Sequence, residues 1–381
     1  MVLTSINCIH KRPRLSPFRV IGISLLIGIN SLLGACQKQN NSAIVTQNQE
    51  KNPSEFSQHK LCQPLDVDSI KESFQATKPW RIGYLLKTSS DPFWQQIDQG
   101  IKQVSQDFGI QATVKFTADK PNSTGDVKNQ IALILDLIES KKVDGLIIAP
   151  EDSIQLVPVV EKATNKGITV IIIDTPIDTN QILTFVSFDN FQAGKMMGKW
   201  VIQQLEKSNP SAHNINVLIL EGSLHEENTV ERRQGFLEGL KTIKKADNLD
   251  ILDMKSAVWE TSKAKEITAD WLKKFSDIDV IMAADDQMAI GASQAVAEAQ
   301  RSGILITGFD GMNQGLNAIK EGKINATVNQ IPEIQVKLMT QLMIDYLEGK
   351  RQYFPPCQLI WKNQTESSLI ITLENIDQYL K

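Results

Sequence analysis

The chain has 381 residues, of which 41% are hydrophobic and 22% charged, and this is typical of a soluble globular protein with one to three domains. Its formal net charge is −4, and no block of five or more basic residues follows the amino-terminal region. The sequence therefore lacks the concentrated positive charge of a nucleic-acid-binding surface, and we expect no nucleic-acid partner.

The first 36 residues have the order of a secretory signal. A positive region ends at Arg19, an apolar run spans 20–33, and Leu33-Gly34-Ala35 places small residues before Cys36. The run is too short for a comfortable transmembrane helix, so we predict a signal peptide over 1–35. The ending resembles a bacterial lipobox, which would make Cys36 the lipidated first residue of a membrane-anchored lipoprotein in the periplasm or at the cell surface. A plain signal anchor, or cleavage elsewhere, is the alternative.

Residues 36–79 are predicted to form a polar tether, because Gln, Asn, Ser and Lys dominate its first part. The stretch 62–74 shows some apolar spacing and is expected to form a short helix or to pack on the body. Cys62 and Cys357 remain once the signal is removed and Cys36 is lipidated. In an oxidising compartment they can form a disulfide, while two separate thiols are an equal alternative. Neither belongs to a CxxC pair, so no zinc site is predicted.

From Arg81 onward, apolar strands alternate with amphipathic helices, which predicts an α/β fold with a parallel sheet covered on both faces. Gly109, Gly145 and Gly167 mark helix ends or strand entries. The first half is predicted to contain strands at 81–87, 112–118, 145–149, 169–173 and 182–188, and helices at 93–108, 125–141 and 154–166.

The same alternation then repeats, so two similar lobes are expected with a ligand cleft between them. The second half is predicted to contain helices at 190–206, 228–243, 261–275, 286–301 and 313–321, and strands at 215–221, 249–257, 279–284, 304–309 and 325–330.

The turn that follows the first of these strands is a candidate ligand contact. Asp91, Phe93 and Trp94 leave the carboxyl end of that strand, where open α/β sheets bind ligands. The alternative is that Phe93 and Trp94 only pack the start of a core helix.

Six motifs in order resemble the ribose- and galactose-type periplasmic sugar-binding proteins, which are type I solute receptors of ABC transporters. The likeness covers residues 80–381. The motifs are Ser90-Asp91-Pro92-Phe93-Trp94, Ile171-Ile172-Ile173-Asp174, Arg232-Arg233-Gln234-Gly235-Phe236, the run from Ala284 to Ala292, Gly308-Phe309-Asp310-Gly311, and Ala326-Thr327-Val328-Asn329-Gln330.

The resemblance implies two doubly wound parallel-sheet lobes joined by a three-strand hinge. It places lobe one at 80–187 plus 331–358 and lobe two at 188–330 plus 359–381. It also implies a monomer without cofactor or metal that closes on a sugar and delivers it to an ABC permease. The ligand contacts that it implies are Asp91, Phe93, Trp94, Asp174, Asn228, Arg232, Trp259, Asp285, Asp310 and Gln330.

Departures from the ribose pattern favour a hexose. Asp91 and Asp285 stand where an amide is expected, Ala149 replaces an asparagine, and Thr175 replaces an arginine. The expected pocket has a net charge of about −3 at neutral pH if all its groups are ionised. The negative charges come from Asp91, Asp174, Asp285 and Asp310, and the positive charge comes from Arg232. An amino sugar, another cationic polyol or a calcium-assisted site would relieve this charge.

Enzymatic function is not expected. His225-Glu226 begins like a zinc protease motif, but Thr229 stands at the second ligand position. Gly194 and Gly198 lie within a helix pattern, where close helix packing explains them, and GxSxG is absent. A sugar-responsive repressor would need a helix-turn-helix module before residue 80, where the chain has a signal and a polar tether. The remaining alternative is a sensory receptor that signals to a membrane histidine kinase or chemoreceptor.

Overall fold

The computed structural model describes residues 62–67, 74–119, 126–140, 142–208, 214–242, 249–361 and 369–380. These residues all fall within one compact unit. The predicted signal peptide, the lipidation site Cys36 and the greater part of the predicted tether lie outside them. In the part of the chain that is described, no helix has both the length and the apolar character needed to cross a membrane.

The first sheet has seven strands in the order β1-β12-β6-β5-β4-β2-β3, and every neighbouring pair is parallel. The central strands of this sheet are buried on both faces, and β4 and β6 are buried throughout, which explains their continuous apolar runs. The strands are β1 (Gln63–Asp66), β2 (Arg81–Thr88), β3 (Gln111–Ala118), β4 (Gly145–Ile148), β5 (Thr169–Ile173), β6 (Thr184–Phe188) and β12 (Cys357–Trp361).

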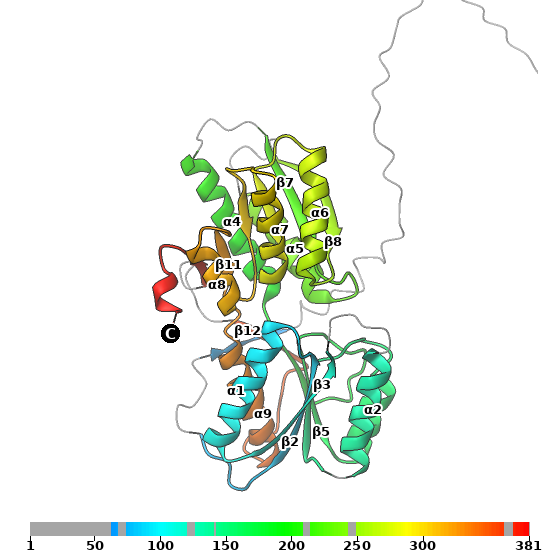
Figure 1. The fold of residues 1–381 in the computed structure, drawn as a ribbon. Coiled ribbons are helices and arrows are strands. Elements are labelled where there is room, and N and C mark those ends of the chain that lie inside the picture. The colour runs from blue at the N-terminus through cyan, green and yellow to red at the C-terminus, as the bar shows by residue number, and fades with distance from the viewer. Residues whose placement is uncertain are drawn as a thin grey trace, which may run out of the picture. The chain divides into compact units, whose positions relative to one another are not determined.

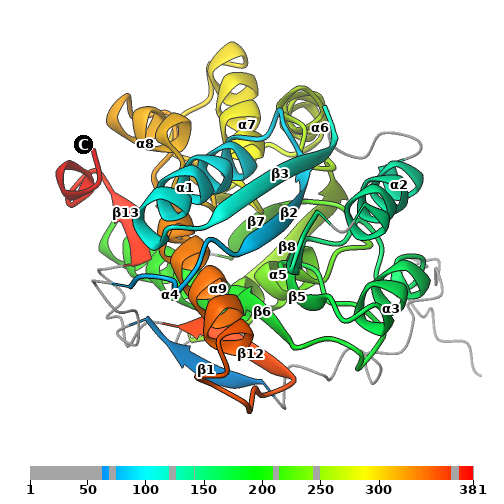
Figure 2. The ribbon, with the colours of Figure 1, turned by 90° about the horizontal axis from the view of Figure 1, so that it is seen from below.

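Helices cover both faces of this sheet (Figure 2). On one face α1 (Pro92–Phe108) and α9 (Pro332–Leu347) pack side by side and share one apolar core with the sheet. On the other face α2 (Asp126–Glu139) and α3 (Val157–Asn165) enclose a second core.

The second sheet has the order β13-β11-β10-β9-β7-β8, and only β13 runs antiparallel to its neighbour. A single apolar core joins the sheet to its helices. Figure 1 shows α6 and α7 together on one face of it. The elements are α4 (Asn190–Ser208), β7 (Ile215–Glu221), α5 (Glu227–Leu240), β8 (Leu249–Ser256), α6 (Thr261–Lys274), β9 (Val280–Ala283), α7 (Asp286–Glu298), β10 (Leu305–Thr307), α8 (Asn313–Lys320), β11 (Ala326–Val328), β13 (Ile370–Thr372) and a 3₁₀ turn at Ile376–Gln378.

Both sheets have the doubly wound order in which the second strand lies outside the first. The order reverses between β2 and β4 in the first sheet and between β7 and β9 in the second. Ligands of such sheets bind at the carboxyl ends of the strands beside these switch points. The chain passes from one sheet to the other after β6, after β11 and after β12. The predicted α/β class with two doubly wound parallel-sheet lobes is confirmed.

The structure corrects the predicted tether. The structure decides between the two alternatives predicted for 62–74, because Gln63–Asp66 packs on the body as strand β1 at the edge of the first sheet and is not helical. The predicted tether therefore does not extend through Gln63–Asp66. Cys62 and Cys357 form a disulfide at the start of β1 and β12, which decides between the two alternatives that the sequence allowed. The predicted lobe boundary at 358 falls inside β12, which stays in the first sheet to residue 361.

The predicted strands and helices from Arg81 onward are all present, with ends that differ by up to three residues. Helix ends differ by three residues at the ends of α5 and α7 and at the start of α3, which begins at Val157 rather than at residue 154. Asp152 accounts for this delay, because its side chain accepts hydrogen bonds from the backbone N–H groups of Ile154 and Gln155 and so holds a turn there.

Glycines bring α4 and α5 into close contact, as predicted for Gly194 and Gly198. A Cβ on Gly194 would lie 2.4 Å from the carbonyl oxygen of Arg232, and one on Gly198 would lie 2.3 Å from that of Phe236. Neither position can accept a larger residue without separating the helices. This close approach fixes where the backbone of Arg232 lies.

Candidate ligand-binding site

A cavity lies at the carboxyl ends of strands from both sheets. It is surrounded by the start of α1, the ends of β2 and β5, the segment between β7 and α5, and the loops after β8, β9, β10 and β11. Its lining consists of Lys87, Thr88, Asp91, Phe93, Trp94, Ala118, Asp126, Glu151, Asp174, Glu226, Asn228, Arg232, Trp259, Asp285, Asp310 and Gln330.

Three of these residues have a strained backbone. Asp174, Trp259 and Asp310 have φ angles of 63°, 66° and 104°, a region that non-glycine residues rarely adopt. Each such residue costs about 1–3 kcal/mol and persists where the surroundings impose it, most often at functional sites. The strain is therefore concentrated where side chains must be aimed into the cavity.

Arg232 is the most firmly held cation in the cavity. Its Nε donates to Asn190 Oδ1 at 2.9 Å, and its Nη1 donates to the carbonyl oxygen of Ala284 at 2.6 Å and to Asp310 Oδ1 at 3.3 Å. The guanidinium carbon lies 3.9 Å from the ring centre of Phe309, and the residue is 4% exposed. A guanidinium fixed by three oxygen acceptors and an aromatic ring is pre-organised to bind a ligand.

Asp310 and its neighbours are held by a scaffold behind the cavity wall. Gln330 Nε2 donates to Asp310 Oδ1. The buried carboxylate of Asp286 accepts from Thr327 Oγ1 at 2.5 Å and from the backbone N–H of Met312 at 2.9 Å. Asp286 thus ties the segment after β10 to β11 and keeps Asp310 in place.

Lys87 is a second buried cation, and it lies at the end of β2. Its Nζ is 2.9 Å from Asp174 Oδ2, 3.2 Å from Glu226 Oε2 and 2.8 Å from Thr175 Oγ1. Burial alone would lower the pKa of Lys87, but the charges of Asp174 and Glu226 outweigh it and raise that pKa. Burial in turn would raise the pKa of Asp174, and Lys87 brings it below its ordinary value.

Two cavity carboxylates cap helices. Asp91 Oδ1 accepts from the backbone N–H of Phe93 at 2.7 Å and begins α1, and Asp285 Oδ1 accepts from Met288 at 2.6 Å and begins α7. Each cap contributes about 1 kcal/mol to its helix. Burial raises the pKa of Asp91 to about 6 and that of Asp285 well above its usual range.

Aromatic faces line the cavity from both sheets. Phe93 and Trp94 meet edge to face, with ring centres 5.1 Å apart, at the start of α1. Trp259 lies against Gly222, where a Cβ would come within 2.0 Å of its ring. Glycine at 222 is thus required for Trp259 to occupy this place.

Comparison with known proteins agrees with this architecture. The sequence-family model for a periplasmic binding protein domain matches residues 82–351 of this chain. The chain belongs to the periplasmic binding protein family. A D-allose-binding periplasmic protein of Escherichia coli is 31% identical over 269 residues, which cover 68% of this chain and 82% of that protein. A ribose import binding protein of Bacillus subtilis is 31% identical over 275 residues, covering 72% and 84%.

Solved structures show the same fold. An ABC transporter periplasmic solute binding protein from Actinobacillus succinogenes with bound D-allose is 28% identical and has a TM-score of 0.68. The match covers 79% of this chain and 100% of that one. A galactofuranose binding protein shares the fold with a TM-score of 0.67 at 24% identity. The type I periplasmic binding protein fold is therefore confirmed.

The binding protein brings all ten predicted contact residues to one cavity. Lobe one supplies Asp91, Phe93, Trp94 and Asp174, and lobe two with its boundary supplies Asn228, Arg232, Trp259, Asp285, Asp310 and Gln330. Phe93 and Trp94 pack in the core, where they are 8% and 5% exposed, and they also line the cavity. Core packing is therefore confirmed for both, and their contact with a ligand stays a prediction.

Several charged cavity residues of this binding protein were not predicted, namely Lys87, Asp126, Glu151 and Glu226. In the sequence, Lys87 is only the end of a strand and Glu226 only part of an incomplete zinc motif. A strand-end signal was available for two of them, since Lys87 ends β2 and Glu151 follows β4 at the expected ligand edge. The predicted net charge of the pocket was based on four aspartates and Arg232. The described lining has three more carboxylic acids and one more cation, Lys87.

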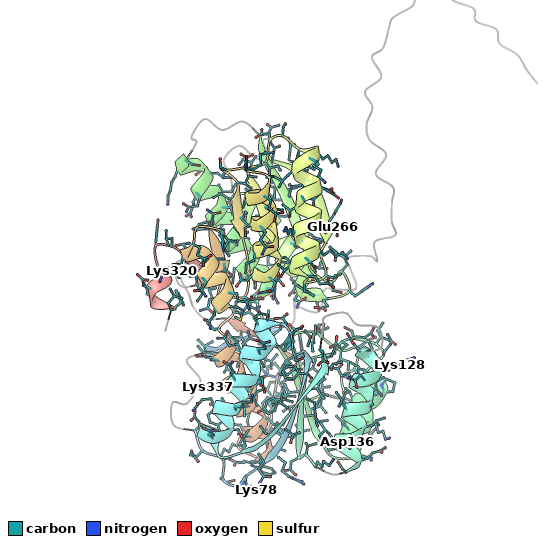
Figure 3. All side chains as sticks on the ribbon, viewed as in Figure 1. Lys78, Lys128, Asp136, Glu266, Lys320 and Lys337 are labelled. Carbon is teal, nitrogen blue, oxygen red and sulfur yellow. A yellow bond between two sulfur atoms is a disulfide. The ribbon has the colours of Figure 1, made fainter. Side chains whose placement is uncertain are left out.

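The charges of the cavity contrast with those elsewhere on the molecule. Lys128, Asp136, Glu266 and Lys320 are exposed on helices, where water solvates them (Figure 3). The charges of the cavity are buried or half-buried, so they must be paired, protonated or matched by a ligand. Across the described residues, no group of three or more His, Cys, Asp or Glu side chains is arranged to hold a metal ion.

Proposed function

We propose that this protein is a lipid-anchored extracytoplasmic receptor that binds a hexose-sized sugar between its two lobes and delivers it to an ABC permease. The role is one of binding and release, and no catalytic step is assigned to the site.

The observation that carries the proposal is the combination of groups in the cavity. A pyranose has apolar C–H faces and a ring of hydroxyls. Trp94 and Trp259 line the cavity from different lobes and offer flat apolar surface for the ring. Arg232 donates hydrogen bonds in a rigid fork, while Asp174 and Asp310 accept them from hydroxyls.

The relatives support transport of a sugar. Two of them, each 31% identical, are named for periplasmic D-allose binding and for ribose import. Asp91, Asp285 and Thr175 depart from the ribose pattern, and the similar structure from Actinobacillus succinogenes holds D-allose. These points favour a hexose over ribose.

Contacts between the lobes support closure around the ligand. Lys87 of lobe one pairs with Glu226 of lobe two at 3.2 Å, and Asn228 Nδ2 donates to Asp174 Oδ1 at 3.3 Å. A ligand that contacts both lobes adds to these contacts and shifts the molecule toward its closed form.

Calorimetry with purified protein tests the proposal. The panel contains pentoses, neutral hexoses, amino sugars and polyols, each with and without a chelator. Saturable heat with at least one hexose or hexose derivative is expected. No heat from any sugar would refute sugar binding.

A sensory role is the alternative, and the fold accommodates both roles. The fructose binding periplasmic domain of a hybrid two-component system has a TM-score of 0.65 at 23% identity, which shows a shared fold. Uptake of the labelled ligand by cells with and without this protein separates the two roles. Transport predicts that uptake is lost with the protein, whereas unchanged uptake favours sensing.

A further inference from the structure

Asp91 and Asp285 come from different lobes and line the same cavity. Asp91 precedes α1 in lobe one, and Asp285 precedes α7 in lobe two. Each carboxylate uses Oδ1 to accept one backbone N–H, at 2.7 Å and 2.6 Å respectively. Closure of the lobes therefore brings two acidic side chains toward the same ligand.

The cavity holds more negative than positive groups. Its lining includes seven carboxylic acids but only two cations, Lys87 and Arg232, among the described residues. Lys87 is committed to Asp174 and Glu226, and Arg232 to Asp310. Within the described structure, neither Asp91 nor Asp285 forms an ion pair with either cation.

Helix capping does not require this charge. Asparagine and serine cap a helix about as well as aspartate, so an uncharged residue would serve α1 and α7 equally. The charge of Asp91 acts on Asp285, so the two carboxylates repel when both are ionised and disfavour closure unless a proton or another cation lies between them. Burial first, and then the charge of Asp91, hold the pKa of Asp285 well above its ordinary value.

We propose that the sugar bound by this protein carries a protonated amine, which is held between Asp91 and Asp285. This inference rests on the proposed function and narrows its ligand to an amino sugar or an aminocyclitol of similar size. An ammonium has three donors, and it can bond to a carboxylate of each lobe at once. The cation then removes the repulsion that opposes closure, so the charged ligand closes the receptor more effectively than its neutral parent.

The affinity for an amine should depend on pH through Asp91. Burial raises the pKa of Asp91 to about 6, so in the empty cavity part of this acid is protonated near neutral pH. An ammonium displaces that proton, whereas a neutral sugar leaves it in place. Amine affinity should therefore rise between about pH 5 and about pH 7, while neutral-sugar affinity should not. The charged groups that act on the pair are Asp174, Glu226, Arg232, Asp286 and Asp310.

Calorimetry on the intact protein tests the inference. The ligands are D-glucosamine and D-galactosamine, their N-acetyl forms and the parent hexoses. At least one free amine should bind about tenfold or more tightly than its N-acetyl and hydroxyl counterparts. Titration in buffers of different ionisation enthalpy should show proton release with the amine only.

Asp91→Asn and Asp285→Asn keep the helix caps and remove one charge each. Each change should weaken amine binding by about tenfold or more and strengthen binding of the neutral parent, because the repulsion is removed. Asp98→Asn is the matched control, since Asp98 pairs with Lys102 on α1 outside the cavity, and it should leave both affinities unchanged. Glu151→Gln removes a charge elsewhere in the cavity and should have a smaller effect.

Specific outcomes would overturn the inference. If a neutral hexose binds more tightly than every amine, the amine assignment fails while the proposed sugar receptor stands. If hexose binding depends on calcium and is lost with chelator, a divalent cation takes the place of the amine. If Glu151→Gln lowers amine affinity as much as Asp91→Asn does, the amine is not held by the Asp91 and Asp285 pair. If no sugar of any kind binds, the proposed function fails as well.

Discussion

Lys87 and Glu226 form an ion pair between the lobes, with Nζ and Oε2 3.2 Å apart. Their side chains are only 8% and 14% exposed, so solvent screens the attraction weakly. Lys87 also pairs with Asp174 within lobe one. Lys87 therefore lines the ligand cavity and also forms an ion pair that holds the two lobes together.

Glu226→Gln should favour the open form in the absence of ligand. Loss of the charged partner removes about 1–3 kcal/mol from the closed arrangement. Small-angle scattering should show a larger radius of gyration for the ligand-free variant. Glu298→Gln removes a shorter but more exposed pair with Lys265 and should leave the scattering unchanged. Identical curves for wild type and Glu226→Gln would show that the pair does not govern closure.

Arg232→Ala should reduce ligand affinity by about thirtyfold or more. Truncating one member of a buried, hydrogen-bonded charge pair typically costs about 2–5 kcal/mol, and here it leaves Asp310 without its cation. Calorimetry measures the loss, and thermal melting reports whether the fold persists. Arg233→Ala is the matched control, because Arg233 pairs with Glu221 and does not line the cavity. Equal affinity for wild type and Arg232→Ala would remove Arg232 from the site.

The stability of the ligand-free protein should fall as pH rises from about 4 to about 7. Burial raises the pKa of Asp91 to about 6 and that of Glu151 to about 7. The folded protein therefore holds more protons than the unfolded chain in this window, and raising the pH withdraws that stabilisation. Asp174 acts in the opposite sense at lower pH, because Lys87 lowers its pKa and its contribution is lost in stronger acid.

Thermal melts of the ligand-free protein across this pH window measure the effect. Glu151→Gln and Asp91→Asn should each flatten the pH dependence, because an amide does not titrate. A melting temperature that rises from pH 5 to pH 7 in the ligand-free protein would contradict the expectation.

Loss of the disulfide should destabilise lobe one. The bond links Cys62 to Cys357 across 295 residues of sequence and holds the four-residue strand β1 against β12. A bridge that closes so long a loop contributes about 2–5 kcal/mol. Denaturant unfolding of the variant with both cysteines changed to serine should show this loss. Reducing agent should have the same effect on the wild type and none on the variant.

Cys36→Ala should release the protein from the membrane fraction if Cys36 carries the proposed lipid. Fractionation of producing cells, followed by detection of the protein, measures the distribution. Cys8→Ala is the control, because Cys8 lies within the predicted signal peptide and is removed with it. Membrane retention of Cys36→Ala would favour the alternative of an uncleaved signal anchor.

Much of the fold follows from local sequence. Strands such as Thr169–Ile173 are buried on both faces, so they appear as continuous apolar runs, and Gly109 ends α1 with a φ of 69°. Asp91-Pro92 signals the start of α1 because an aspartate caps it and proline occupies its first turn. The ends of α3 and the strand character of Gln63–Asp66 escaped prediction, because a side-chain turn and a distant strand partner decide them.

The sequence by itself determined the alternating α/β elements and the turn with Asp91, Phe93 and Trp94, since burial periodicity and capping act over a few neighbouring positions. The resemblance to the sugar-binding family supplied the other predicted contacts. Only the tertiary structure decided the disulfide and the pairing of Lys87 with Asp174 and Glu226. It also decided that Asp91 and Asp285 line the same cavity as Lys87 and Arg232 while the two cations pair with other carboxylates. These relationships join residues far apart in sequence, and burial changes their electrostatic energy in a way that no local pattern records.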